Sequence, residues 1–163
     1  MPEQIHLLNK RVHLYQPLKG FRTSMDAVML AAACPAKQGQ TVLDAGCGVG
    51  GAMYCLAWRV PGLQITGVDI EDKAIDLAMR ARNLNPGLDA ELDFVCDDIR
   101  AYANNREGVF DSVICNPPYM EAGTHIASPE SAKAGARGNM DEDMDLKTWL
   151  KTCHRVLKPN ACL

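Results

Sequence analysis

Four consecutive residues combine hydrogen-bond acceptors with an aromatic ring: Asn116, Pro117, Pro118 and Tyr119. The Asn116 side-chain oxygen and the Pro117 carbonyl could hold both N–H groups of one amino group, and the prolines leave that carbonyl without a local N–H competitor. Adenine N6 and carboxamide nitrogens are poor nucleophiles because their lone pair is delocalised; two acceptors could draw such a nitrogen toward sp³ geometry. With Tyr119 stacked on the planar group, the pattern predicts methylation of a planar amine by positioning and electrostatics. A plain proline-rich turn is the structural alternative.

A glycine-rich turn precedes this motif in the chain, within residues 42–51 (VLDAGCGVGG). Glycine allows a tight bend and lets a ligand approach the main chain. Gly46, Gly48 and Gly51 also satisfy the G-x-G-x-x-G pattern of dinucleotide-binding dehydrogenases. Asp44 favours another ligand, because it would repel a pyrophosphate but attract a positive charge such as the amino group of S-adenosylmethionine. Hydrogen bonding of Asp44 to turn amides is the simpler alternative.

Two further acids follow strand-like runs. Asp69 could accept both hydrogen bonds of a ribose diol. Asp98, with Asp97 beside it in the turn, could accept a hydrogen bond from the amino group of a cofactor's adenine. Each of these acids also precedes a helical pattern, so a helix cap is the alternative role for both.

Short apolar runs alternate with helical patterns, which predicts a parallel sheet wrapped by crossover helices. The expected strands are 41–45, 64–69, 92–95 and 110–115. The expected helices are 52–60, 71–84 and 146–157, the last ended by Pro159. An almost wholly apolar helix over 27–34, capped by Ser24 or Asp26, should lie buried against the sheet or over a cofactor. Residues 120–140 are expected to form one long loop.

The composition indicates one soluble domain of 163 residues, with a lead over 1–40 and a Rossmann-like core over 41–163. Its odd set of seven cysteines contains no C-x-x-C pair, and the histidines are scattered, so we expect neither disulfides nor a metal site. No apolar run is long enough for a membrane span and no signal sequence opens the chain, which favours the cytoplasm. The net charge of −3 argues against broad coating of nucleic acid but allows a local contact.

The carboxyl end of the chain reads as an incomplete sheet. Residues 158–160 form a turn pattern, and residues 161–163 read as the opening of a fifth strand. We therefore expect an unpaired sheet edge and an uncovered apolar helix face. Such surfaces favour either self-association or a longer native protein.

The order of the motifs DAGCGVGG, GVD, CDDI and ICNPPY resembles that of N6-adenine and N5-glutamine methyltransferases. Residues 8–17 (LNKRVHLYQP) and 20–30 (GFRTSMDAVML) resemble the opening of the bacterial tRNA(Val) adenine N6-methyltransferase family. The resemblance covers about Ile5 to Leu163. It implies an α/β fold of the class I methyltransferases, a Rossmann-like, doubly wound, mostly parallel sheet, here truncated after the start of the fifth strand. It also implies S-adenosylmethionine as cofactor and, as substrate, a tRNA adenine beside the anticodon.

The resemblance also implies roles for individual residues. It places the cofactor on Arg22 or its neighbours, Asp44, Gly46, Gly48, Asp69 and Asp98. It places the acceptor nitrogen on Asn116, Pro117 and Tyr119. The loop after Tyr119, with Ser128, Pro129, Lys133 and Arg137, would contact RNA, although a solvated loop suits those two cations equally well. The chain departs from the family pattern at Asn160, where a glycine is usual, and in lacking the terminal strands.

Three other functions compete with an RNA adenine methyltransferase. A protein-glutamine N5-methyltransferase acting on release factors shares the chemistry, but such enzymes carry a helical domain ahead of the glycine-rich strand, and only about 40 residues precede it here. A catalytically silent S-adenosylmethionine-binding fragment would fit a truncated sheet. An NAD-dependent dehydrogenase has no use for residues 116–119.

Overall fold

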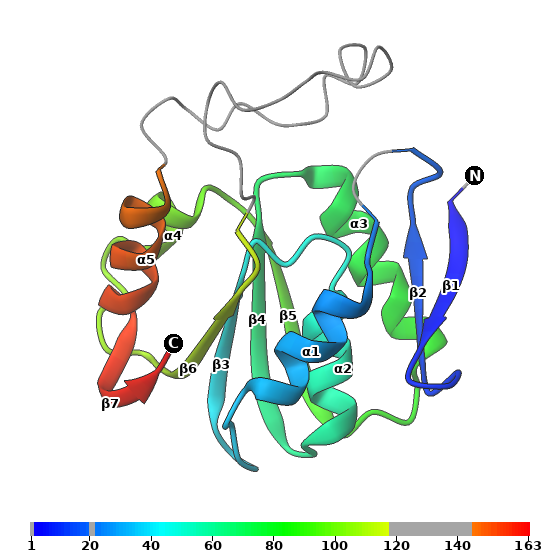
Figure 1. The fold of residues 1–163 in the computed structure, drawn as a ribbon, viewed down its shortest axis with the longest axis horizontal. Coiled ribbons are helices and arrows are strands. Elements are labelled where there is room, and N and C mark those ends of the chain that lie inside the picture. Colours follow the sequence, from blue (N-terminus) through cyan, green and yellow to red (C-terminus); the bar gives the residue numbers. More distant parts are fainter. Residues whose placement is uncertain (1, 20–21, 118–144) are drawn as a thin grey trace.

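The computed structural model describes residues 2–19, 22–117 and 145–163 (Figure 1). The strands are β1 (Glu3–Leu7), β2 (Val12–Gln16), β3 (Thr41–Ala45), β4 (Leu63–Asp69), β5 (Ala90–Cys96), β6 (Phe110–Cys115) and β7 (Leu157–Cys162). The helices are α1 (Met25–Ala33), α2 (Gly51–Arg59), α3 (Asp72–Ala81), the 3-10 turn η1 (Arg82–Leu84), α4 (Ile99–Ala103) and α5 (Leu146–Arg155). None of the helices in these ranges is both long and apolar enough to cross a bilayer.

Five parallel strands form the central sheet in the order β5-β4-β3-β6-β7. From β3 the chain first builds outward through β4 to β5, then returns to the other side of β3 for β6 and β7. The doubly wound, Rossmann-like sheet expected from the sequence is therefore present. Its strand order reverses between β3 and β6, and ligands of open α/β sheets bind at such a switch point, beyond the carboxyl ends of the strands.

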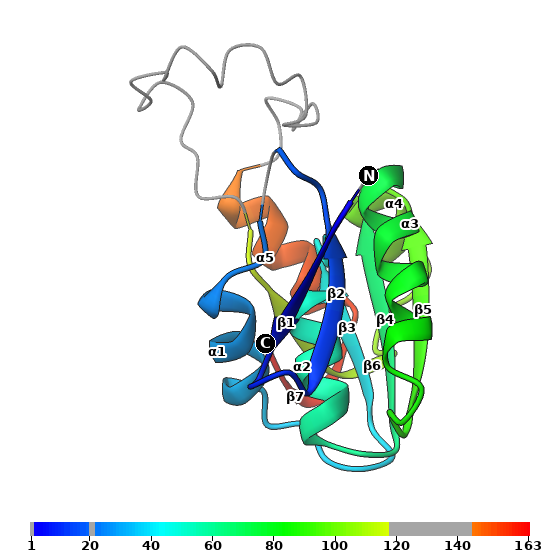
Figure 2. The same cartoon turned by 90° about the vertical axis from the view of Figure 1, so that its right-hand side faces the viewer.

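Helices cover both faces of the sheet, as Figures 1 and 2 show. Alternate residues of one strand serve the two faces: Val42 belongs to the core cluster that includes residues of α1, α2 and the β1–β2 hairpin, whereas Leu43 belongs to the cluster that includes residues of α4 and α5. Both side chains are fully buried. Burial on two sides explains why β3 and β6 do not show a strict alternation of apolar and polar residues.

The β1–β2 hairpin was not expected from the sequence. Its turn contains no glycine or proline; instead Leu8, Asn9 and Lys10 adopt left-handed backbone angles, with φ of 50°, 53° and 65°. Asn9 is the one residue of this turn that commonly adopts such angles, and without a neighbouring glycine or proline it was not recognised as a turn signal. The hairpin packs on α3 and α2 and buries Val12 and Leu14 completely.

Two expectations are wrong: that the helix over 27–34 is buried against the sheet, and that the fifth strand begins at residue 161. The apolar helix α1 is not buried: among its residues only Ala31 is buried, while Met25 and Met29 are 68% and 63% exposed. It packs mainly on α2, so a single face of the helix is covered. Its predicted cap is confirmed, since the Ser24 hydroxyl accepts a hydrogen bond from the Asp26 amide.

The second wrong expectation concerns the carboxyl end. Helix α5 ends at Arg155, and β7 begins at Leu157 rather than at residue 161. β7 pairs with β6 through a register irregularity, so β6 has strands on both sides. Asn160 has a φ of 63°, the left-handed geometry expected where the family pattern has glycine. The short helix α4 was also missed, because five residues are too few to show a helical period.

Asn85 fastens the hairpin to the end of α3, and its removal should destabilise the fold. Its side-chain oxygen accepts from the His13 amide (3.0 Å), and its nitrogen donates to the carbonyls of His13 (2.7 Å) and Ala81 (2.8 Å). We expect Asn85→Ala to lower the free energy of unfolding by about 2 kcal/mol, since buried main-chain groups lose their partners. Urea denaturation measures the change. The exposed Asn83→Ala is the matched control, expected within about 0.5 kcal/mol of the parent chain. Equal effects of the two substitutions would show that Asn85 does not fasten the hairpin.

Candidate functional site

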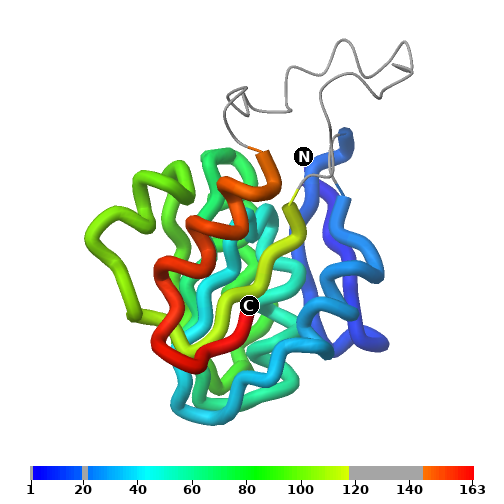
Figure 3. Tube along the Cα trace, turned by 60° about the vertical axis from the view of Figure 1, so that its left-hand side comes forward, coloured from blue at the N-terminus to red at the C-terminus, as the bar shows by residue number. Residues whose placement is uncertain are grey.

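The site lies at the carboxyl edge of the sheet, where the strand order reverses. Ala45, the last residue of β3, pairs with Val68 of β4 on one side and with Cys115 of β6 on the other. The glycine-rich turn after β3 therefore begins between the ends of β4 and β6. The first turn of α5 lies at the same edge as the end of β6 (Figure 3).

The glycine-rich turn depends on backbone angles that favour glycine. Gly46, Gly48 and Gly50 have φ values of 76°, 54° and 83°. The amides of Gly46 and Cys47 both donate to the Val68 carbonyl, at 2.8 and 3.1 Å, which fixes the turn to β4. A Cβ added at Gly48 would meet no atom within 4 Å, so a ligand could approach the backbone at that point.

Asp69 ties the glycine-rich turn to the start of α3. One carboxylate oxygen accepts from the Gly48 amide at 2.7 Å, and the other accepts from the Glu71 amide at 2.9 Å. Each carboxylate oxygen has a further lone pair. The half-buried side chain can therefore hold the turn and still accept hydrogen bonds from a diol.

Asp44 is a buried acid with no cationic partner among the described residues. Its side chain is 2% exposed, and one carboxylate oxygen has no hydrogen-bond partner among the described residues. Burial, and then the negative charges of Asp69 and Cys115, raise the pKa of Asp44 to about 7; a hydrogen bond from the Met53 backbone opposes this rise. An unpaired buried carboxylate is costly, and a bound cation would remove much of that cost. Burial, and then the negative charges of Asp44 and Asp69, raise the pKa of the Cys47 thiol.

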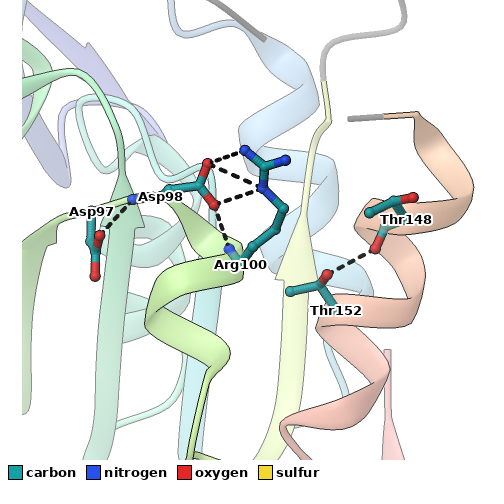
Figure 4. A network of polar contacts seen from close by, with 5 residues as sticks. All are labelled: Asp97, Asp98, Arg100, Thr148 and Thr152. Atoms are coloured by element: carbon teal, nitrogen blue, oxygen red, sulfur yellow. Dashed lines mark hydrogen bonds and ion pairs between the residues drawn. The ribbon is translucent and has the colours of Figure 1, made fainter. Parts of the chain in front are cut away.

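Asp98 has the helix-cap role that the sequence left open. It caps α4 by accepting from the Arg100 amide at 2.7 Å, and its carboxylate pairs with the Arg100 guanidinium at 2.8 Å (Figure 4). The hydrogen bond to the Arg100 side chain is the largest cause of its lowered pKa. Asp97 lies behind it, accepting from the Asp98 amide at 2.8 Å and donating its own amide to the Asp69 carbonyl at 3.0 Å. Both strand-end acids are thus linked through one short segment.

Asn116 and Pro117 follow directly on the last residue of β6. Asn116 is half-buried and Pro117 is buried. Because Cys115 pairs with Ala45, these residues leave the sheet next to the start of the glycine-rich turn. Tyr119 lies outside the described residues. So do Pro118 and the loop over 120–140, with Ser128, Pro129, Lys133 and Arg137.

Arg22 lies in the segment between the β1–β2 hairpin and α1. It is exposed, and its guanidinium pairs with Glu3 of the hairpin at 2.6 Å. Its neighbour Thr23 does reach the start of α2, because a Cβ added at Gly51 would lie 2.5 Å from the Thr23 methyl carbon. The segment around Arg22 therefore covers the glycine-rich turn through Thr23.

Trp149 is a residue of this edge that the sequence analysis missed. Its ring lies against the first glycine of the turn: a Cβ added at Gly46 would be 3.2 and 3.3 Å from two indole carbons. The Cys153 thiol, and to a smaller degree the Trp149 indole, lower the pKa of Cys115, which precedes Asn116. The one available signal was a rare residue, one of two tryptophans, in the helix that follows residues 116–119.

Two curated relatives resemble the chain over most of its length. It is 28% identical over 155 residues to the tRNA1(Val) (adenine(37)-N6)-methyltransferase of Shewanella sediminis, covering 93% of this chain and 62% of the relative. The protein of the same name from Shewanella halifaxensis is 30% identical over 156 residues, covering 93% of this chain and 60% of the relative. The chain thus spans about 60% of the length of these relatives.

The fold also matches a solved structure, the S-adenosylmethionine-dependent methyltransferase of Agrobacterium tumefaciens. The TM-score is 0.63 at 21% identity, over 98% of this chain and 50% of that one. At this identity the likeness shows a shared fold. The family model described as "Methyltransferase small domain" matches residues 24–134, more than half of the chain. That range contains the glycine-rich turn, the three strand-end acids and residues 116–119, and the chain belongs to the methyltransferase small domain family.

Proposed function

We propose that the chain is the cofactor- and acceptor-binding part of an enzyme that methylates N6 of a tRNA adenine beside the anticodon. The observation that carries the proposal is the meeting of two groups at one sheet edge. Asp44 offers a buried carboxylate with one oxygen unpartnered among the described residues, and the Asn116–Pro117 pair offers two acceptors one strand away. The names of the curated relatives support adenine over glutamine as acceptor.

S-adenosylmethionine fits the residues on the cofactor side of this edge and would supply the methyl group. Asp44 would pair with its ammonium group, which answers the unpartnered carboxylate oxygen. Asp69 would accept the ribose hydroxyls with its remaining lone pairs, and Asp98 the adenine amino group. The open backbone at Gly48 would allow the cofactor a close approach, and Gly46, which begins the same turn, would contribute through its bend in the main chain.

On the acceptor side, the side-chain oxygen of Asn116 and the carbonyl of Pro117 would take the two N–H groups of the adenine. Both acceptors belong to a segment anchored on β6, so their spacing is set before the substrate arrives. Holding the nitrogen by both hydrogens reduces its conjugation and directs its lone pair. Tyr119 would stack on the base once it has left its own stack.

The tRNA contact that we propose is local, because the chain carries a net charge of −3 and cannot neutralise many phosphates. We place the reaction in the cytoplasm, with its substrate. β7 is the last strand of the sheet formed by the described residues, and its outer edge could pair with a second copy.

Methyl transfer to unmodified tRNA tests the proposal directly. Transfer RNA transcribed in vitro and incubated with the chain and S-adenosylmethionine should yield N6-methyladenosine on nucleoside analysis. Release factors incubated in parallel should gain no N5-methylglutamine. Binding of S-adenosylhomocysteine without turnover on any tRNA would instead identify this chain as a silent binding module.

Cofactor affinity should depend on pH through Asp44. Below about pH 7 the carboxyl of the free protein is protonated, whereas the ammonium group prefers the ionised form, so binding releases a proton. Affinity for S-adenosylhomocysteine should therefore rise between about pH 5.5 and about pH 7.5. Calorimetry in buffers of different ionisation enthalpy measures both affinity and proton release. Asp44→Asn should bind weakly without the rise, and the exposed control Asp76→Asn should keep it. A pH rise that persists in Asp44→Asn would assign the titration elsewhere.

Asn116→Ala should separate catalysis from cofactor binding. We expect methyl transfer to fall by at least about 10²-fold, the scale for losing one group that acts on the transition state. Affinity for S-adenosylhomocysteine should change less than about threefold, because the lost oxygen faces the acceptor. Single-turnover rates and calorimetry provide the two values, with Asn83→Ala as control. Near-parental turnover in Asn116→Ala would disprove its acceptor role.

A further inference from the structure

Trp149 is held at the site edge by a well-capped helix. It lies in the first turn of α5, where its amide donates to the Asp145 carbonyl at 3.0 Å. The Asp145 side chain caps the same turn by accepting from the Thr148 amide at 2.7 Å. One turn further along, Cys153 is fully buried against β3 and β6. The capped first turn and the buried Cys153 therefore hold the part of α5 that carries Trp149.

The indole contacts the two segments that form the proposed site. Its six-membered ring occupies the space that a side chain of residue 46 would need, at 3.2 to 3.3 Å from that position. Gly46 has a φ of 76° and begins the cofactor turn. The other neighbour is Cys115, because the indole lowers the pKa of its thiol. Cys115 directly precedes Asn116 in the chain. The ring therefore spans from the end of β3 to the end of β6.

The indole nitrogen is an unusual feature of this contact. It is buried and has no other partner in the described parts of the chain, but hydrogen bonding from the indole lowers the pKa of the Cys115 thiol. The ring of a phenylalanine would keep the packing on Gly46 without this donor. The flat ring and the contact with Cys115 are therefore two separate features of Trp149.

We infer that Trp149 is a positioning residue, which holds the Gly46 turn against the end of β6 and so sets the spacing between cofactor and acceptor. The inference rests on the proposed function, because it assigns a role within that site. It predicts that the indole senses cofactor binding and that its contact with Gly46 contributes to cofactor affinity. It also predicts that a flat ring at this position is required, since it has to fit between two strand ends.

Fluorescence of a chain with one tryptophan tests the first prediction. Trp58→Phe leaves Trp149 as the sole tryptophan, and Trp149→Phe leaves only Trp58, which lies on α2 under Arg11. Titration with S-adenosylhomocysteine should change the emission of Trp149 with the same midpoint as the heat of binding, and should leave Trp58 unchanged. Heat without a change in Trp149 emission would overturn the inference and leave the proposed function standing. Absence of heat in the parent chain would overturn the cofactor assignment, and the inference with it.

A double-mutant cycle tests the contact with Gly46. Gly46→Ala should weaken S-adenosylhomocysteine binding strongly in the parent chain, because the new Cβ meets the indole. In the Trp149→Leu background the same substitution should cost about threefold to tenfold less, since the ring is gone and the backbone strain is common to both chains. Trp149→Phe keeps a flat ring, and its affinity should stay within about twofold of the parent. Thermal melting confirms that each variant is folded. Additive effects in the cycle, or a Trp149→Phe as weak as Trp149→Leu, would overturn the inference.

Discussion

The pairing of β3 with β4 on one side and β6 on the other is the constraint from which the site follows. Parallel strands end at the same edge, and the reversal of strand order brings segments far apart in sequence to that edge. Ala45 is the common neighbour: Val68 and Cys115 flank it. If β6 were placed beyond β5 instead, Asn116 and Pro117 would lie three strands away from the glycine-rich turn.

This arrangement brings negative charges together and offsets them with backbone donors. Asp69 accepts from two amides, and Asp98 has both an amide and a guanidinium. Asp44 is the exception, because burial and the nearby Asp69 and Cys115 both disfavour its ionised form. The uneven distribution of donors leaves one carboxylate that a cationic ligand can stabilise, so the electrostatic cost is concentrated at the position where a ligand would remove it.

The sequence predicted the sheet better than its surroundings, and the reasons are physical. β3 and β6 are short, mainly apolar segments bounded by turn residues, and their limits were predicted to the residue. The strand-end acids and Asn116 were singled out because their chemistry is specific; the structure brings them to one sheet edge, and their roles in binding stay predictions. The β1–β2 hairpin was missed because Asn9 alone, without glycine or proline beside it, is a weak turn signal, and the exposure of α1 was missed because apolar composition does not say what covers a helix. Trp149 could not be predicted, since its contact with Gly46 depends on how α5 packs.

The bonds between Asn85 and His13 join residues that are 72 positions apart. A two-stranded hairpin alone is marginally stable in water. During synthesis β1 and β2 are made before the helix that holds them, which follows only after β3, α2 and β4. The hairpin therefore gains its packing partners only after β3, α2, β4 and α3 have been synthesised. A chaperone or protease that acts during translation would find Val12 and Leu14 accessible until then.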